Sequence, residues 1–159
     1  MTAIQDIPLK TITGGDATLG DYAGQVLLVV NVASKCGFTP QYEGLEQLHE
    51  RLSGRGFAVL GFPANDFAGQ EPGTDEEIAE FCRSTYSIQF PMFSKIKVLG
   101  PDRHPLYREL SGDEDVHWNF EKFLISRTGE VVGRFPTQIA PDDAELSAAI
   151  ERELAAPRP

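Results

Sequence analysis

The sequence predicts an α/β fold in which helices cover both faces of a mixed central sheet. Residues 25–33 and 57–62 are apolar on both faces, which is typical of strands in the middle of a doubly covered sheet. A helical segment separates them, so we expect these two strands to be parallel. Near the C-terminus, two further strand segments flank a tight turn and add an antiparallel pair.

An N-terminal hairpin is expected before this sheet. Residues 7–13 and 17–19 flank Gly14, Gly15 and Asp16, and these turn-forming residues are typical of the loop of a β-hairpin.

Two helices accompany the buried strands. Between residues 40 and 52 three leucines recur at helical spacing, namely Leu45, Leu48 and Leu52. Thr74 and Glu77 have the spacing of a capping box, which opens a second helix over 74–85.

The remaining expected elements are a short edge strand (91–93), a short helix (106–110), two strands (120–126 and 130–135) and a final helix (142–154). This order, with its mixed sheet flanked by helices and its N-terminal β-hairpin, is that of a thioredoxin-like fold. We expect a single domain over residues 1–159, with 155–159 as a flexible tail.

Composition narrows the class of protein. Hydrophobic residues make up 41% and charged residues 24%, as in ordinary soluble globular proteins. The net charge of -10 repels phosphate backbones, so we expect no nucleic-acid partner. The longest apolar run, residues 26–30, is too short to insert into a membrane. The N-terminus lacks the features of a secretory signal, so we expect a cytoplasmic protein.

The cysteine and histidine counts limit metal chemistry. Cys36 and Cys82 are too few for a disulfide scaffold or a four-cysteine metal site. No two of the histidines, His49, His104 and His117, are four residues apart, so we expect no metal centre.

Cys36 has the location of a reactive thiol. It follows the buried strand that ends at Ala33 and precedes the helix that starts near Pro40. Sites in open α/β sheets form at this edge, and the nearby helix N-terminus and Lys35 favour the thiolate. On location alone, a small buried apolar residue that happens to be cysteine is an equal alternative.

The two cysteines, at positions 36 and 82, are too far apart in sequence to form a C-x-x-C motif. Thr39 stands where such a motif has its second cysteine, so a plain thioredoxin-type disulfide exchanger is excluded. If Cys36 is oxidised, any intramolecular partner must be Cys82. Cys82 shares a helix face with Ile78 and Tyr86, and this spacing by itself favours a core cysteine. To reach Cys36, the helix would have to open locally.

Three more polar or aromatic residues near this sheet edge are candidates, each with a plain structural alternative. Gln70 lies in a turn-rich loop, where a solvated amide is common. Trp118 is the only tryptophan and precedes Asn119 just before a strand, as a packing aromatic beside a turn former would. His117 has no identifiable partner, and we expect it to face solvent.

Three sequence blocks carry a family resemblance. They are NVASKCGFT (31–39), GFPAN through GQEPG (61–73) and WNFEKFL (118–124), in that order. The chain resembles the glutathione peroxidases, in particular their small cysteine-containing, thioredoxin-dependent branch. The resemblance extends from about residue 7 to 154.

The resemblance implies roles for five residues. Cys36 matches the peroxidatic residue, and Gln70, Trp118 and Asn119 match the rest of the family's catalytic tetrad. Amide and indole N–H groups are donors, which stabilise a thiolate and polarise a peroxide bond. Cys82 matches the resolving cysteine of the thioredoxin-dependent branch. The resemblance therefore favours a resolving role for Cys82 over the core role that its helical spacing suggests.

The sequence also departs from the family pattern. Ala64 stands where a cysteine is usual, so this position cannot resolve the oxidised thiol. Asp66 replaces a common glutamine and Ala68 a common glycine, which affects the geometry of their loop. The segment 100–115 is short, whereas tetrameric relatives carry an extra loop there, so the resemblance implies a monomer.

The implied reaction is the two-electron reduction of hydrogen peroxide or of an organic or lipid hydroperoxide. Thiolate Cys36 attacks the peroxide and becomes a sulfenic acid, and Cys82 condenses with it to a disulfide. Thioredoxin, or alternatively glutathione, then restores the thiols, and no cofactor is needed. Two other functions remain open: a peroxide sensor that oxidises a partner protein, and a non-catalytic binding module with vestigial cysteines.

Overall fold

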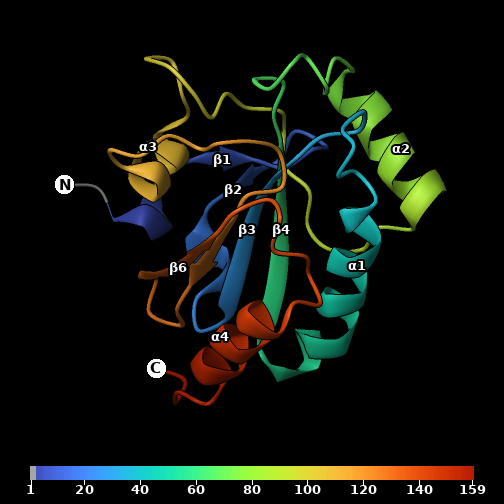
Figure 1. The fold of residues 1–159 in the computed structure, drawn as a ribbon. Coiled ribbons are helices and arrows are strands. Elements are labelled where there is room, and N and C mark those ends of the chain that lie inside the picture. The colour runs from blue at the N-terminus through green and yellow to red at the C-terminus, as the bar shows by residue number, and fades with distance from the viewer. Residues whose placement is uncertain (1–2) are drawn as a thin grey trace.

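A four-stranded mixed sheet forms the centre of the computed structural model, which describes residues 3–159 (Figure 1). Its strands follow one another in the order β4 (Phe57–Pro63), β3 (Val26–Val32), β5 (Lys122–Ile125) and β6 (Val131–Phe135). β3 and β4 are parallel, and β5 and β6 are antiparallel to their neighbours. The predicted mixed sheet is therefore confirmed.

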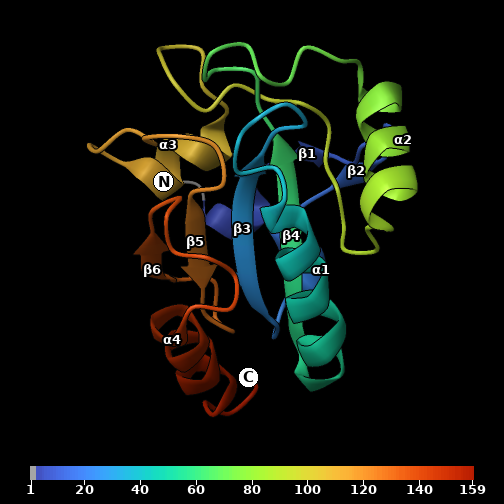
Figure 2. The same cartoon turned by 45° about the vertical axis from the view of Figure 1, so that its right-hand side comes forward.

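Both faces of the sheet are covered, because β3 and β4 are buried along their whole length. α1 (Gln41–Leu52), α2 (Asp75–Tyr86) and α4 (Ala144–Leu154) contribute to the hydrophobic cluster on one face. α3 (Pro105–Ser111) and the N-terminal segment contribute to the cluster on the other. In Figures 1 and 2, α1 and α4 lie along the sheet, and α2 stands beside one end of α1.

The N-terminal hairpin is present but short. β1 (Leu9–Lys10) and β2 (Asp16–Ala17) pair antiparallel and form a sheet of their own. Gly14, with φ of 95°, supplies the left-handed residue that this tight turn requires.

One expected element is absent from the described chain. Residues 91–93 form no strand, and only two isolated bridges link them to other segments, Met92 to Gly61 and Phe93 to Thr11. Pro91 has no N–H group to donate to a ladder, which limits pairing at this position. The segment instead ties the hairpin to β4.

Helix α2 begins as the sequence predicts. The Glu77 N–H donates to Thr74 Oγ1 over 3.2 Å, and the Thr74 N–H donates to Glu77 Oε1 over 2.9 Å, which completes the capping box.

None of the helices in residues 3–159 is long and apolar enough to cross a membrane.

Two carboxylates fix the ends of α2 to the rest of the fold. At its start, Asp75 accepts hydrogen bonds from Ser94 Oγ at 2.5 Å and the Lys95 N–H at 3.0 Å. After its end, Glu46 of α1 accepts from the N–H groups of Gln89 at 2.8 Å and Phe90 at 3.3 Å. We call these two contacts the α2 anchors.

Candidate active site

Cys36 lies in the turn between β3 and α1, and its sulfur accepts a backbone hydrogen bond. The Phe38 N–H donates to Sγ over 3.3 Å. The Cys36 N–H donates to Thr39 Oγ1 at 2.9 Å, and that hydroxyl donates to the Ala33 carbonyl at 2.8 Å. Thr39, at the place of a second cysteine, therefore braces the loop that presents the thiol.

The loop after β4 lies directly against the Cys36 loop. The Lys35 N–H donates to the Gln70 carbonyl over 3.0 Å. Asn119 Nδ2 donates to Gln70 Oε1 over 3.0 Å, so these two amides meet although they are far apart in sequence. The Asn119 amide thus holds Gln70 rather than pointing a hydrogen bond at Cys36.

Trp118 joins this group from the turn before β5. Its ring packs against Phe67 of the Gln70 loop, with ring centroids 5.3 Å apart. Its carbonyl accepts from Asn31 Nδ2 of β3 at 3.1 Å, and the Asn31 carbonyl accepts from the Phe120 N–H at 2.6 Å. The structure thus brings Gln70, Trp118 and Asn119 to the edge of the sheet at which Cys36 lies.

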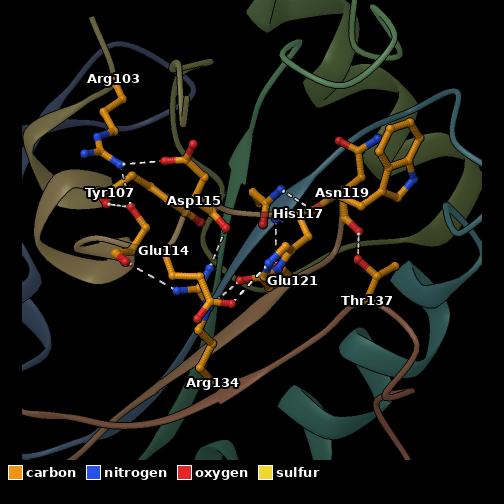
Figure 3. Close-up of polar contacts among 12 residues, drawn as sticks. Arg103, Tyr107, Glu114, Asp115, His117, Asn119, Glu121, Arg134 and Thr137 are labelled. Carbon is orange, nitrogen blue, oxygen red and sulfur yellow. Dashed lines mark hydrogen bonds and ion pairs between the residues drawn. The ribbon is translucent and has the colours of Figure 1, made fainter. Parts of the chain in front are cut away.

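A network of ion pairs and hydrogen bonds surrounds the buried carboxylate of Glu121, just after this turn (Figure 3). Glu121 accepts from the His117 N–H at 2.9 Å and from Arg134 Nε at 2.6 Å. Arg134 Nη2 also donates to the Asp115 carbonyl at 2.9 Å. His117 faces solvent as expected, but the expectation of no partner is wrong, since its ring contacts Glu114 and Glu121.

Lys122 lies buried beneath the turn. Its ammonium donates to Gln41 Oε1 at 2.7 Å and to the Phe120 carbonyl at 2.8 Å. The residue before Phe120 is held as well, since Thr137 Oγ1 donates to the Asn119 carbonyl at 2.6 Å. Burial lowers the pKa of Lys122 from 10.5 to about 7, and the nearby Glu121 opposes this effect. Sequence reasoning missed this buried charge.

Cys82 packs into the core from α2, as its helical spacing predicts. It shares a hydrophobic cluster with Ile78 and Cys36, and both cysteines are free thiols. Burial raises the pKa of Cys82 to about 11, and the hydroxyl of Tyr42 partly offsets the increase.

Comparison with known proteins identifies the family of this fold and site. The sequence profile of the glutathione peroxidase family matches residues 4–111. The chain belongs to the glutathione peroxidase family. It is 47% identical to the hydroperoxy fatty acid reductase gpx1 of Synechocystis sp., covering 91% of this chain and 92% of that protein. It is 46% identical to the thioredoxin/glutathione peroxidase BtuE of Escherichia coli, covering 92% and 94% respectively.

Solved structures agree with this assignment. The crystal structure of Trgpx in apo form superposes with a TM-score of 0.80 at 36% identity, and the match covers 100% of each chain. A thioredoxin-family thiol:disulfide interchange protein from Chlorobium tepidum superposes with a TM-score of 0.73 at 18% identity, over 97% of each chain. This glutathione peroxidase therefore has the predicted thioredoxin-like fold.

The departures from the family pattern have visible structural effects. Asp66, at the place of a common glutamine, accepts from the N–H groups of Val98 at 3.1 Å and Leu99 at 3.3 Å. Ala68, at the place of a common glycine, has φ of 57°, a conformation that strains a residue with a Cβ. The first substitution gives the loop a tertiary contact, and the second adds local strain.

The site holds no cluster of metal ligands. Within residues 3–159, no three histidine, cysteine, aspartate or glutamate side chains are grouped so that they could bind a metal ion.

Proposed function

We propose that this glutathione peroxidase reduces hydroperoxides with Cys36 as its peroxidatic thiolate. The observation that carries the proposal is the meeting of the Cys36, Gln70 and Asn119 segments through the Lys35–Gln70 and Asn119–Gln70 hydrogen bonds. The Phe38 N–H, donated to Sγ, stabilises negative charge on the sulfur.

The Gln70 and Trp118 side chains supply the donors for the peroxide. Asn119 occupies Gln70 Oε1, which fixes the orientation of the amide and turns its NH₂ group away from Asn119. The Gln70 NH₂ and the Trp118 indole N–H are then available to polarise the O–O bond as negative charge develops on the leaving oxygen.

The proposed reaction proceeds in three steps. The Cys36 thiolate attacks the terminal peroxide oxygen and the O–O bond breaks, so Cys36 becomes a sulfenic acid. The leaving oxygen takes up a proton and departs as an alcohol or as water. Cys82 then attacks the Cys36 sulfur, forming a disulfide and releasing water. An external dithiol reduces the disulfide by exchange.

The names of the relatives support a choice of substrates and reductant. Those of the two relatives above refer to hydroperoxy fatty acids and to thioredoxin or glutathione. We propose organic hydroperoxides and hydrogen peroxide as substrates and thioredoxin as the reductant, with glutathione as the alternative. The proposal includes a cytoplasmic, monomeric protein with one domain, for which light scattering should give about 17.5 kDa.

A coupled peroxidase assay tests the proposal. The purified protein receives cumene hydroperoxide or hydrogen peroxide, with either thioredoxin and its reductase or glutathione and its reductase. Turnover with thioredoxin that greatly exceeds turnover with glutathione supports the proposal, and the reverse order assigns glutathione as reductant. Absence of turnover with both reductants contradicts the proposed function.

A further inference from the structure

A cluster of buried polar groups lies between the Cys36 loop and α2, outside the set of residues used above. Glu71 is 1% exposed and Tyr42 is fully buried. Three of the cluster's oxygen atoms, Tyr42 Oη, Glu71 Oε2 and Ser34 Oγ, make no hydrogen bond of good geometry, although Tyr42 Oη lies beside Cys82 and Ser34 Oγ beside the Glu71 carboxylate. Such orphaned buried atoms are rare in folded proteins and call for an explanation, which can be a catalytic role.

Glu71 is held against the peroxidatic loop. Its Oε1 accepts a hydrogen bond of 3.1 Å from the N–H of Ser34, two residues before Cys36. Its own N–H donates to Asn65 Oδ1 at 2.8 Å, and its carbonyl accepts from Lys95 Nζ at 3.1 Å. One carboxylate oxygen is thus fixed to the loop, while Oε2 remains available.

The same cluster contacts the resolving cysteine. The Tyr42 ring packs on Phe81 and Tyr86 of α2, with centroids 6.4 and 5.5 Å away, so it brackets the helical turn that carries Cys82. The Tyr42 hydroxyl lies beside the Cys82 sulfur, and the negative charge of Glu71 acts on both groups. A cavity of about 290 Å³ separates the Glu71 loop from the first turns of α2, with Ser34, Glu71, Ile78 and Phe81 in its wall.

The disulfide-forming step needs a proton acceptor. The Cys82 thiol, whose pKa burial raises to about 11, is protonated at neutral pH, whereas the thiolate is the nucleophile. The hydroxyl of the Cys36 sulfenic acid must also leave with a proton as water. A group that takes the first proton and returns it serves both needs.

Resting on the proposed function, we propose that Glu71 is the general base and acid of the resolving step. Its carboxylate removes the proton from the Cys82 thiol while α2 is folded, and the thiolate then attacks Sγ of Cys36 as α2 opens. The S–S bond forms, the S–O bond of the sulfenic acid breaks, and the proton passes from Glu71 to the departing hydroxide. One water molecule leaves, and Glu71 is again a carboxylate.

The electrostatic surroundings of Glu71 suit this role. Burial raises its pKa, while hydrogen bonds from Ser34 and the charges of Lys95 and Lys35 oppose this increase. Glu77 lines the same cavity, and Tyr42 and Cys82 are the titratable groups on the core side. A carboxylate with a raised pKa is a more effective base than an ordinary one.

The test compares the two oxidation steps in a Glu71→Gln variant. Glutamine keeps an oxygen for the Ser34 N–H but cannot take a proton. Reduced protein is mixed with hydrogen peroxide, and quenched samples are analysed by mass spectrometry for sulfenic acid and disulfide. We expect the ratio of the disulfide-forming rate to the sulfenic-acid-forming rate to fall at least 10-fold, within the range of general base catalysis.

A matched control is Glu46→Gln. Glu46 is also a buried carboxyl with an unpartnered Oε2, and glutamine keeps an oxygen for the Gln89 and Phe90 N–H groups, so the C-terminal α2 anchor is retained. The rate ratio of this variant should stay within about 2-fold of the parent value. A Glu71→Gln ratio equal to that of Glu46→Gln overturns the inference.

The parent protein provides a second test that needs no substitution. Its disulfide-forming rate should fall as pH decreases through the raised pKa of Glu71, and Glu71→Gln should lack this acid limb. The inference is overturned if the disulfide-forming rate of the parent protein shows no decrease at acidic pH and changes only at alkaline pH, where a thiol ionises. Parent protein that forms no sulfenic acid on Cys36 contradicts the proposed function instead, so the two failures are distinguishable.

Discussion

Cys36 and Cys82 are buried to a similar extent, 7% and 3% exposed, yet their surroundings differ. Cys36 lies in a loop at the end of a strand, where a backbone N–H reaches its sulfur. Cys82 lies within a helix whose backbone N–H groups are engaged, among the rings of Tyr42, Phe81 and Tyr86. Burial alone therefore does not distinguish the two thiols, whereas the backbone donor that reaches the Cys36 sulfur does.

The supports of the two regions differ as well. The turn opposite Cys36 is held by several buried hydrogen bonds, from Asn31, Thr137 and Lys122. In residues 3–159, side-chain hydrogen bonds to the rest of the fold hold α2 only at its two ends, through the α2 anchors, and its middle is held by apolar packing. The first arrangement suits a preorganised site, and the second suits a segment that rearranges.

The largest expected effect comes from removing the peroxidatic sulfur. Cys36→Ser should abolish peroxide turnover with every reductant, because a serine hydroxyl is not ionised at neutral pH. Steady-state assays with thioredoxin and with glutathione measure this. Substantial turnover in the variant would contradict the assignment of Cys36, rather than another residue, as the group that attacks the peroxide.

The next effect tests the donors on the Cys36 side. Gln70→Ala and Trp118→Phe should each slow oxidation of Cys36 by about 10- to 1000-fold, by analogy with oxyanion-hole donors. Phenylalanine retains the ring that packs on Phe67 and loses the indole N–H. Rapid-mixing kinetics with hydrogen peroxide give the rate, and Gln89→Ala, an exposed amide beyond α2, is the control.

The next prediction concerns α2, the helix that carries Cys82, which should open when the protein is oxidised. Bonded cysteines have Cα atoms within about 7 Å, and we expect α2 to unwind at least partly to meet this limit. Peroxide treatment should raise amide hydrogen exchange across Asp75–Tyr86 in the parent, and Cys82→Ser should keep the protection. An oxidised protein with α2 intact and no Cys36–Cys82 bond would show that an external thiol resolves Cys36.

A smaller effect concerns the buried ammonium beneath the Trp118–Asn119 turn. With a pKa of about 7 when folded and 10.5 as the ordinary value, Lys122 binds more proton in the unfolded chain between these limits. Its contribution therefore makes the free energy of unfolding rise with pH from about 7 to 10.5. Urea denaturation of Lys122→Met should lack this rise, whereas the exposed-site control Lys97→Met should retain it.

The smallest effect concerns strain in the Gln70 loop. Ala68→Gly relieves the cost of a Cβ at φ of 57° and should stabilise the protein by about 0.5–1 kcal/mol. Thermal denaturation measures the change. A loss of stability would indicate that the methyl group packs favourably enough to outweigh the strain.

The sequence predicted most of the fold because local signals agree there. The buried strands, the leucine spacing of α1 and the capping box of α2 each depend on neighbouring residues. The expected strand at 91–93 failed, since pairing there depends on distant segments and Pro91 donates no N–H.

The candidate site was predicted by residue type and motif, but its contacts were not. The Asn119–Gln70 bond, the Thr39 brace and the burial of Lys122 each join residues that no local pattern relates. Glu121 was missed as the partner of His117 for a different reason: the two residues are four apart, but the segment that carries them is not helical, so their spacing did not indicate a contact.

The α2 anchors also define a tether. Cys82 lies midway between Asp75 and Gln89, the points at which the chain stays attached when the helix opens. A segment fixed at both ends cannot diffuse away, and short flexible tethers give effective concentrations in the millimolar range. Cys82 then competes with a dissolved monothiol on equal terms only when that thiol is itself millimolar. We therefore expect the length of chain between the anchors, together with the protonation of the Cys82 thiol, to decide whether a reductant meets a disulfide or a sulfenic acid.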